Sequence, residues 1–310
     1  MAITAKQVKE LREMTGAGMM DCKKALGQTD GDMDKAVEWL RENGLAKAAK
    51  KAGRIAAEGI VATALTEDEK KAVVVEVNAE TDFVAKNEKF QDYVAEVAAQ
   101  AKTTSAADID AFLAEPWALD TSVTVDEKLK AMIAVIGENM NIRRFAKIET
   151  EGTVVSYIHA GGKIGVLVEA DTANATDAVK ECLKNVAMQI AALNPKYLSS
   201  DDVDAEYKEH EKEILLAQAK NDPKNAGKPD EIIEKMIIGR LNKELKEVCL
   251  LEQPYVKAEN KENVKKYVES VAKAEGVSIN LKSFVRFETG EGLEKKEEDF
   301  AAEVAAQMGN

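Results

Sequence analysis

The residues from Val73 to Phe90 bring a carboxylate, an aromatic ring and an amine together in one short segment. The sequence Thr81-Asp82-Phe83-Val84 follows a stretch rich in β-branched residues, which favours a strand, and precedes an amphipathic pattern, which favours a helix. Lys86 stands four residues after Asp82. Because phenylalanine is usually buried, the simplest interpretation is that Phe83 pins the start of the helix, with Asp82 as its N-cap.

Nucleophilic and metal-based catalysis need residues that this chain mostly lacks. Only two histidines are present, His159 and His210, and no Cys-x-x-Cys pair occurs, so a histidine triad or a zinc site is not expected. The segment Gly161-Gly162-Lys163-Ile164 is similar to the end of a phosphate-binding loop. However, Tyr157 replaces the required glycine, and Ile164 replaces the Ser or Thr that would bind magnesium. We therefore expect no covalent chemistry, no cofactor and no bound metal.

The overall composition indicates a folded, very soluble protein of two or three domains. The chain has 310 residues, of which 45% are hydrophobic, 32% charged and only 5% aromatic. No segment approaches the ~18 apolar residues of a membrane span, and the N-terminus has no apolar signal-peptide region. The three cysteines are odd in number and far apart, which suits a reducing compartment. We expect a cytoplasmic protein without membrane contact.

The net charge of −13 argues against a broad surface for binding nucleic acid. Residues 1–54 are more basic, with 11 Lys and Arg against 8 Asp and Glu. Residues 47–54 form a small basic cluster, which is either a solvated helix end or an RNA contact. The helix end is the preferred interpretation, and no direct contact with nucleic acid is expected.

Residues 4–44 have the pattern of a small helical module. The first helix is expected to begin at a capping box formed by Thr4 and Gln7 and to end before Gly16. A second helix is expected over residues 20–26, and a third from Asp32 to Gly44. A module of about 40 residues has a small core, so it should be only marginally stable alone.

Two later segments have the same order of elements. Residues 59–83 and 152–177 each have the pattern of a strand, a turn, a strand and a loop. Amphipathic helices follow at residues 88–101 and 177–193. Two antiparallel hairpins, each covered by a helix, predict an α+β core of two similar antiparallel-sheet-plus-helix subdomains.

The sequence changes character after Leu198. Residues 203–220 are highly charged, residues 221–229 contain two prolines, and residues 230–250 have a helical apolar stripe. This pattern predicts an antiparallel helical hairpin, which either packs on the core or projects as an arm for self-association or partner contact. Further on, the pattern predicts a helix over residues 264–275, a strand over 283–288 and a last helix that contains Phe300.

Several motifs, in a fixed order, resemble one known family. They are VKELREMTGAGMMDCKKAL near the start, TDFVAKNEKF, IGENMNIRR, YIHAGGKIGVLV and the closing EDFAAEVAAQ. Through these motifs the chain resembles the elongation factor Ts family, the guanine nucleotide exchange factors of elongation factor Tu in translation. The resemblance covers essentially the whole chain, and five motifs in order are far more specific than one short pattern.

The resemblance implies a domain organisation. Residues 1–54 would be an N-terminal module similar to a ubiquitin-associated fold, with a linker. The remaining units would be core subdomain N at 55–148, core subdomain C at 149–198 and 251–287, an inserted helical hairpin of the dimerisation type at 199–250, and a C-terminal module at 288–310. The hairpin further implies a homodimer, or a complex of two copies with two partners.

The resemblance also implies how the partner, elongation factor Tu, is bound. The segment Thr81, Asp82, Phe83 and Val84 corresponds to the one that displaces magnesium from the partner, with Phe83 as a wedge between partner helices. This contrasts with the buried Phe83 that the residues alone suggest. The other contacts implied are Lys9, Arg12, Met19, Met20, Lys23, Ile136, Gly137, His159 and Phe300. From the residues alone, Met19 and Met20 could instead pack in the module core.

A different class of function remains as the alternative. A helical adaptor could bind a ubiquitin-like or other protein through its N-terminal module without driving nucleotide exchange. Such an adaptor would bind its partner with the same affinity whatever the nucleotide, and Phe83 would not matter. An RNA-binding protein would depend on residues 47–54 and would show a steep salt dependence.

Overall fold

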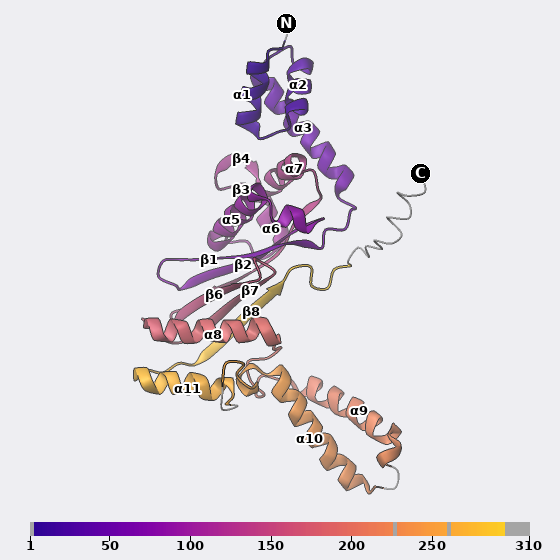
Figure 1. Ribbon diagram of the computed structural model, residues 1–310, viewed down its shortest axis with the longest axis vertical. Coiled ribbons are helices and arrows are strands. Elements are labelled where there is room, and N and C mark those ends of the chain that lie inside the picture. Colours follow the sequence, from indigo (N-terminus) through magenta and orange to yellow (C-terminus); the bar gives the residue numbers. More distant parts are fainter. Residues whose placement is uncertain (1–2, 226–227, 259–261, 295–310) are drawn as a thin grey trace.

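The computed structural model describes residues 3–225, 228–258 and 262–294. Over these residues the chain is a mixed helix-and-sheet protein (Figure 1). Helices at the N-terminal end are followed by two stacked sheets, and a pair of helices projects at the opposite end. The strands within each sheet pair antiparallel. This arrangement agrees with the predicted α+β class.

The N-terminal module consists of α1 (Ala5–Thr15), α2 (Met19–Gln28) and α3 (Met33–Lys51). The predicted capping box at the start of α1 is confirmed. The predicted end of the third helix at Gly44 is wrong, because α3 continues to its bound at Lys51. Gly44 lies within the helix and faces a neighbouring one, since a Cβ at this position would lie 3.4 Å from the Cβ of Ala134.

The first sheet has the strand order β1-β2-β5, so β2 is its central strand. Val73, Val75 and Val77 of β2 pack beneath the helices on one face, whereas Val74 packs against the second sheet. A strand that is buried on both faces is hydrophobic along its whole length instead of alternating. The strand β5 was not predicted. The bounds are β1 (Glu58–Leu65), β2 (Lys71–Ala79) and β5 (Met140–Glu149).

Helices cover the outer face of the first sheet (Figure 1). A small hairpin of β3 and β4 precedes α7 and buries Trp117. Of these elements only α5 was predicted as a helix. The bounds are α4 (Asp82–Ala85), α5 (Glu88–Thr103), α6 (Ile109–Ala114), β3 (Pro116–Trp117), β4 (Asp120–Thr124) and α7 (Val125–Ile136).

The second sheet has the strand order β6-β7-β8, and α8 lies on its outer face with α11 beyond it (Figure 1). The predicted helices at residues 177–193 and 264–275 are confirmed to the residue. The predicted strand over residues 283–288 is present as part of β8, which pairs with β7. The bounds are β6 (Thr153–His159), β7 (Ile164–Ala170), α8 (Asp177–Leu193), α11 (Val264–Glu275) and β8 (Leu281–Glu288).

The two sheets pack face to face through one apolar layer. Val61 and Val74 of the first sheet and Val154 and Leu167 of the second belong to this layer. A backbone hydrogen bond of 2.7 Å, from the Val61 N–H to the Gly162 carbonyl, also joins the sheets. The inner faces of both sheets are therefore fixed relative to each other.

The helical arm consists of α9 (Ala205–Asn221) and α10 (Asp230–Val248), with short 3₁₀ turns at Pro223–Asn225 and Leu250–Glu252. It projects away from the sheets (Figure 1). Its apolar residues pack on each other across the two helices, so the alternative that the stripe packs on the core is wrong. The residues of this cluster include Leu215, Ala219, Ile233 and Ile237.

All three cysteines are free thiols with buried side chains. Cys22 belongs to the core of the N-terminal module, Cys182 to the core between the second sheet and α8, and Cys249 to a small cluster at the base of the arm. Each thiol therefore lies in a different packing cluster of the chain.

Candidate functional site

Phe83 is 79% exposed, the largest exposed fraction among the large hydrophobic side chains that the structure describes. It lies in α4, a single helical turn between β2 and α5. The adjacent Val84 is only 9% exposed and packs into the core of the first sheet. The interpretation that Phe83 pins the helix start is therefore wrong, because Val84 does this and directs Phe83 to solvent.

Thr81, and not Asp82, is the N-cap of this turn. The Val84 N–H donates to the Thr81 hydroxyl at 3.4 Å. Asp82 occupies the first helical position and pairs with Lys86 at 2.6 Å, and the same amine lies 5.9 Å from the centre of the Phe83 ring. The hydrogen bond from Lys86, with the charge of Lys163 nearby, lowers the pKa of the Asp82 carboxyl below its ordinary 3.8. The exposed face of the turn thus presents an anion beside an aromatic ring.

A neighbouring loop, between α7 and β5, holds this turn in place. The Glu138 carboxylate accepts from the Thr81 N–H at 3.0 Å and from the Thr81 hydroxyl at 2.7 Å. In return, the Asn139 N–H donates to the Glu80 carboxylate at 2.6 Å. Sequence reasoning did not identify Glu138 as a site residue, although it lies within the motif IGENMNIRR.

Ile136 and Gly137 lie next to the same contact. Ile136 is the last residue of α7 and packs partly on the core of the first sheet. Gly137 ends the helix in the left-handed conformation, with φ at 93°. Its carbonyl accepts a hydrogen bond from Lys51, in the last turn of α3. The structure therefore brings Ile136 and Gly137 together with the Thr81–Val84 turn.

His159 ends β6 and is exposed, with its Nδ1 2.9 Å from the Tyr157 hydroxyl. The turn after it reaches the first sheet, because Gly162 bonds to β1 and Lys163 pairs with Glu58. Lys163 is also one of the charges that lower the pKa of Asp82. The hairpin end that carries His159 is thus held beside the same sheet as the Phe83 turn.

The five predicted contacts on the N-terminal module are all exposed. Lys9 and Arg12 lie on α1, and Lys9 pairs with Glu13 at 3.6 Å. Lys23 lies on α2, as do Met19 and Met20. These two methionines are 58% and 74% exposed, so the alternative that they pack in the module core is wrong.

A cleft of about 260 Å³ separates the module from α7 and β4. Trp39 and Leu45 line it on the module side, and Val123 and Val135 line it on the other. Beside the cleft, α3 of the module contacts α7, and Arg41 pairs with Glu127 at 3.4 Å.

The basic cluster at residues 47–54 makes contacts within the chain. Lys47 pairs with Asp21 at 2.8 Å, and Arg54 lies 3.4 Å from the Glu80 carboxylate. Lys51 donates to the Gly137 carbonyl, as described above. These residues form the end of α3 and the turn after it, which agrees with the preferred interpretation of the cluster.

A second polar centre, which sequence reasoning missed, lies between the two sheets. The fully buried Glu76 of β2 accepts from Arg143 at 3.0 Å, from Arg144 at 2.6 Å and from the Gly290 N–H at 2.8 Å. Burial raises the pKa of the Glu76 carboxyl, but the hydrogen bonds from Gly290, Asn78 and the two arginines outweigh it and hold the pKa below 4.5. The available signal was a single Glu in a valine-rich strand, followed later by an Arg-Arg pair.

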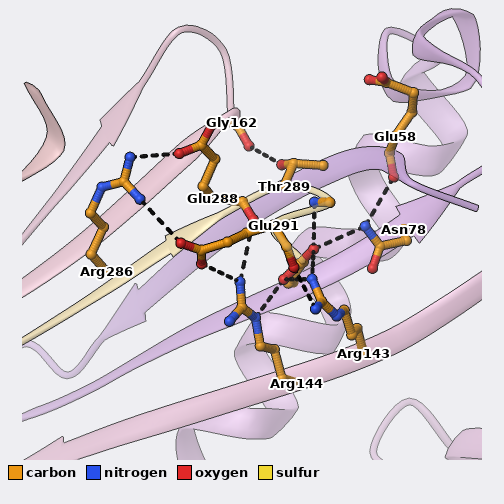
Figure 2. A network of polar contacts seen from close by, with 11 residues as sticks. Glu58, Asn78, Arg143, Arg144, Gly162, Arg286, Glu288, Thr289 and Glu291 are labelled. Atoms are coloured by element: carbon orange, nitrogen blue, oxygen red, sulfur yellow. Dashed lines mark hydrogen bonds and ion pairs between the residues drawn. The ribbon is translucent and has the colours of Figure 1, made fainter. Parts of the chain in front are cut away.

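This network fastens the segment after β8 to the first sheet. Figure 2 shows Arg143 and Arg144 on one side and Thr289 and Glu291 on the other. Arg144 pairs with Glu291 at 3.1 Å, and the Thr289 hydroxyl donates to the Gly162 carbonyl at 3.1 Å. Gly290 has φ at 72°, and a Cβ there would lie 2.1 Å from the Ala57 carbonyl oxygen, so this close approach requires glycine.

The part of the chain that the structure describes has neither a metal-ligand cluster nor a membrane-spanning helix. There, no group of three or more His, Cys, Asp or Glu side chains is arranged to hold a metal ion. None of the helices over the same residues is long and apolar enough to cross a membrane. The predicted contact Phe300 lies outside the described residues.

Comparisons with known proteins agree on one family. The family model described as "Elongation factor TS" matches residues 80–291, which include the Phe83 turn, the Glu138 loop and the Arg143 and Arg144 partners of Glu76. The chain is 56% identical to elongation factor Ts of Clostridioides difficile (strain 630) over 306 residues, which is 99% of both chains. It is 54% identical to that of Clostridium novyi (strain NT) over 307 residues, again 99% of both. Since these matches run through every element described above, the chain belongs to the elongation factor Ts family.

Proposed function

We propose that this chain is a guanine nucleotide exchange factor that binds elongation factor Tu and promotes GDP release, so that GTP can rebind during translation elongation in the cytoplasm. The observation that supports this most is the exposure of Phe83 on a turn that other residues hold in place. Phe83 is exposed although its neighbour Val84 is buried. Burial of such an exposed aromatic ring in a pocket on a partner makes the binding free energy more favourable.

In this mechanism Phe83 inserts between two helices of the partner's GTPase domain. A GTPase of this class holds the diphosphate through backbone amides, a lysine and a magnesium ion. Separating the helices moves those groups away from the phosphates. Each charge-assisted hydrogen bond is worth about 1.5–3 kcal/mol, so the loss of two accelerates release by about 10²- to 10⁴-fold.

Asp82 would act on the magnesium ion of the partner. It is ionised at neutral pH, since Lys86 holds the pKa of its carboxyl below even the ordinary 3.8. The pair with Lys86 is exposed on both sides, and exposed pairs contribute little to stability. Asp82 can therefore leave Lys86 at small cost and take part in displacing the metal. No covalent chemistry by this chain is required.

The remaining contacts would lie partly on the N-terminal module and partly on later segments of the chain. Lys9, Arg12, Met19, Met20 and Lys23 would bind the GTPase domain from the N-terminal module, which we propose to be similar to a ubiquitin-associated fold. Ile136 and Gly137 would border the wedge, His159 would face another domain of the partner, and Phe300 would grip the GTPase domain. Because linkage is reciprocal, rebinding of nucleotide would release the exchange factor.

We also propose the domain divisions expected from the sequence, with units at 1–54, 55–148, 149–198 with 251–287, 199–250 and 288–310. In this proposal the α9–α10 arm lies in the unit 199–250 and mediates a homodimer, or a complex of two copies with two partners. Ile232 and Ile238 support this role, because they are 48% and 46% exposed on α10.

The test is stopped-flow release of fluorescent GDP from elongation factor Tu, with the native chain and with Phe83→Ala. The native chain should accelerate release. Phe83→Ala should reduce the accelerated rate at saturation by at least about tenfold, since buried aromatic anchors carry much of an interface's energy. The matched control is Leu119→Ala, which removes a 70% exposed apolar side chain from the β3–β4 turn and should leave the rate unchanged.

The outcomes separate the alternatives. If the native chain binds without accelerating release, the exchange function is wrong and the adaptor function is supported. If release is accelerated equally by Phe83→Ala, exchange stands and the wedge is wrong. If Leu119→Ala lowers the rate of GDP release as much as Phe83→Ala does, the decrease is due to the loss of any exposed apolar side chain, and the wedge is wrong.

A further inference from the structure

The turn that carries Phe83 is too short to hold its own conformation. α4 has four residues, and two of the backbone hydrogen bonds that close it are long, at 3.4 Å from Ala85 to Thr81 and 3.3 Å from Lys86 to Asp82. A single helical turn fixes several dihedral angles for very few hydrogen bonds, so it is unfavourable in isolation. The direction of the exposed Phe83 ring must therefore be set by contacts from outside the turn.

The contacts from outside the turn include two that act on different residues, Val84 and Thr81. Val84 packs into the core, which anchors one end of the turn. At the other end, Glu138 accepts from both the N–H and the hydroxyl of Thr81, with one carboxylate oxygen for each donor. The Thr81 hydroxyl in turn accepts from the Val84 N–H. A chain of hydrogen bonds thus runs from Glu138 through the N-cap into the turn.

Glu138 is itself held by its neighbours in the loop. Gly137, immediately before it, ends α7 in the left-handed conformation and binds Lys51 through its carbonyl. Asn139, immediately after it, is 2% exposed and binds both the Glu80 carboxylate and the Arg54 carbonyl. The carboxylate therefore projects from a fixed backbone towards Thr81.

We propose that Glu138 is a positioning residue for nucleotide exchange, which fixes the direction of Phe83 by holding the Thr81 cap. This inference rests on the proposed function of Phe83 as the wedge. A turn fixed before binding loses less conformational entropy when Phe83 enters the partner. Removing Glu138 should therefore slow nucleotide release from the assembled complex and leave the affinity, which depends on the other contacts, nearly unchanged.

The side chain must be a carboxylate to make both bonds as observed. Glutamine has one acceptor oxygen, and its amide nitrogen can only donate. In Glu138→Gln one of the two Thr81 donors loses its acceptor. A hydrogen bond to a charged group stabilises the conformation that contains it. Its loss corresponds to about a 10- to 100-fold change in the equilibrium constant for that conformation, or in a rate that depends on it.

The experiment measures two properties of Glu138→Gln. The first is amide hydrogen exchange at Thr81 and Val84 in the free chain, which should become about 10- to 100-fold faster. The second is release of fluorescent GDP from elongation factor Tu across a range of exchange-factor concentrations. The saturating rate should fall about tenfold or more, whereas the concentration for half-saturation should change little. The control Glu88→Gln removes one negative charge from an exposed position on α5 and should alter neither property.

A second pair of variants tests the same hydrogen bonds from the Thr81 side, in case Glu138→Gln does not fold. Thr81→Val removes the hydroxyl and keeps the shape of the side chain, so it should reproduce the effect on both properties. Thr81→Ser restores the hydroxyl and should recover most of the native rate. In the double variant Glu138→Gln with Thr81→Val, the losses should not add, because both changes break the same hydrogen-bond chain.

The results test the positioning role of Glu138 and the proposed exchange function separately. Unchanged amide exchange, or faster amide exchange with an unchanged saturating release rate, would overturn the role of Glu138. Failure of the native chain to accelerate release would overturn the proposed function, whereas the amide exchange of Glu138→Gln would still decide whether Glu138 fixes the turn.

Discussion

The loop after β2 and the loop after β7 occupy corresponding places in the two sheets, since each follows a central strand. In the first loop the Glu80 carboxylate accepts from the N–H of Asn139, the residue before β5, at 2.6 Å. In the second, the Asp171 carboxylate accepts from the N–H of Asn280, the residue before β8, at 3.0 Å. Each carboxylate thus ties the end of the central strand to the start of the third strand.

The loops differ immediately after this shared contact. The Thr81 hydroxyl donates to a side-chain carboxylate, Glu138, whereas the Thr172 hydroxyl donates to the backbone carbonyl of Ser278 at 2.7 Å. The first loop then presents the exposed Phe83, and the second continues with small and polar residues, 173–175. The strand-to-strand contact is therefore common to both loops, and the loops diverge from the next residue onwards, Thr81 or Thr172.

The central strands differ as well. Four residues before Glu80 stands Glu76, and four residues before Asp171 stands Leu167. Both side chains are fully buried, but Leu167 packs in the apolar layer between the sheets, whereas Glu76 binds two arginines and the Gly290 N–H. At this one position the first sheet therefore has a charged residue, whereas the second has an apolar one.

The largest expected effect comes from making the two central strands alike. Glu76→Leu places in β2 the residue type that β7 has, and it leaves Arg143 and Arg144 without their buried partner. Breaking a buried ion pair from one side costs about 3–5 kcal/mol of unfolding free energy. Urea denaturation of the variant and the native chain measures this loss. Equal stability would mean that the charged centre is no more than a substitute for apolar packing.

Acid should remove part of the same contribution without a mutation. The folded-state pKa of Glu76 lies below its unfolded value of 4.5, so its stabilising contribution is complete above pH 4.5 and is lost as the pH falls through the folded pKa. The difference in unfolding free energy between the native chain and Glu76→Gln should therefore be constant near neutral pH and shrink below 4.5. A difference that stays constant into acid would show that the Glu76 charge contributes nothing.

The smallest effect tests the shared contact itself. Glu80→Ala leaves the buried Asn139 without its acceptor, and it should cost about 1–3 kcal/mol. Asp171→Ala breaks the corresponding bond, but Asp171 and Asn280 are both exposed, so water replaces the acceptor and the cost should stay below about 1 kcal/mol. Thermal unfolding of the two variants measures both costs. The reverse order would contradict the idea that burial, and not the bond alone, separates the two loops.

Local patterns in the sequence predicted a large part of the fold. The amphipathic helices α8 and α11 were predicted to the residue, because each combines a regular apolar stripe with a polar N-cap, Thr176 or Asn263. The end of α3 was wrong, because Gly44 meets a neighbouring helix instead of ending its own. β5 was missed, because its polar residues face a buried partner that only the tertiary structure supplies.

The candidate site was harder to predict than the fold. Which of two adjacent apolar residues, Phe83 or Val84, is buried depends on how the turn is oriented on the sheet, and the local pattern does not determine this. The bond from Thr81 to Glu138 joins residues 57 positions apart. The bond from Gly290 to Glu76 joins residues 214 positions apart. Such contacts have no periodic signature, so their polar partners look like ordinary surface residues in the sequence.

The separate placement of the three cysteines gives the native chain a set of internal probes. Burial raises the pKa of all three thiols, that of Cys182 and of Cys249 to about 11, so almost none of them is in the reactive thiolate form at neutral pH. Alkylation then requires that the surrounding cluster opens. The modification rate of Cys22, Cys182 or Cys249 thus reports the opening of the module, the second sheet or the arm base, each without an engineered label.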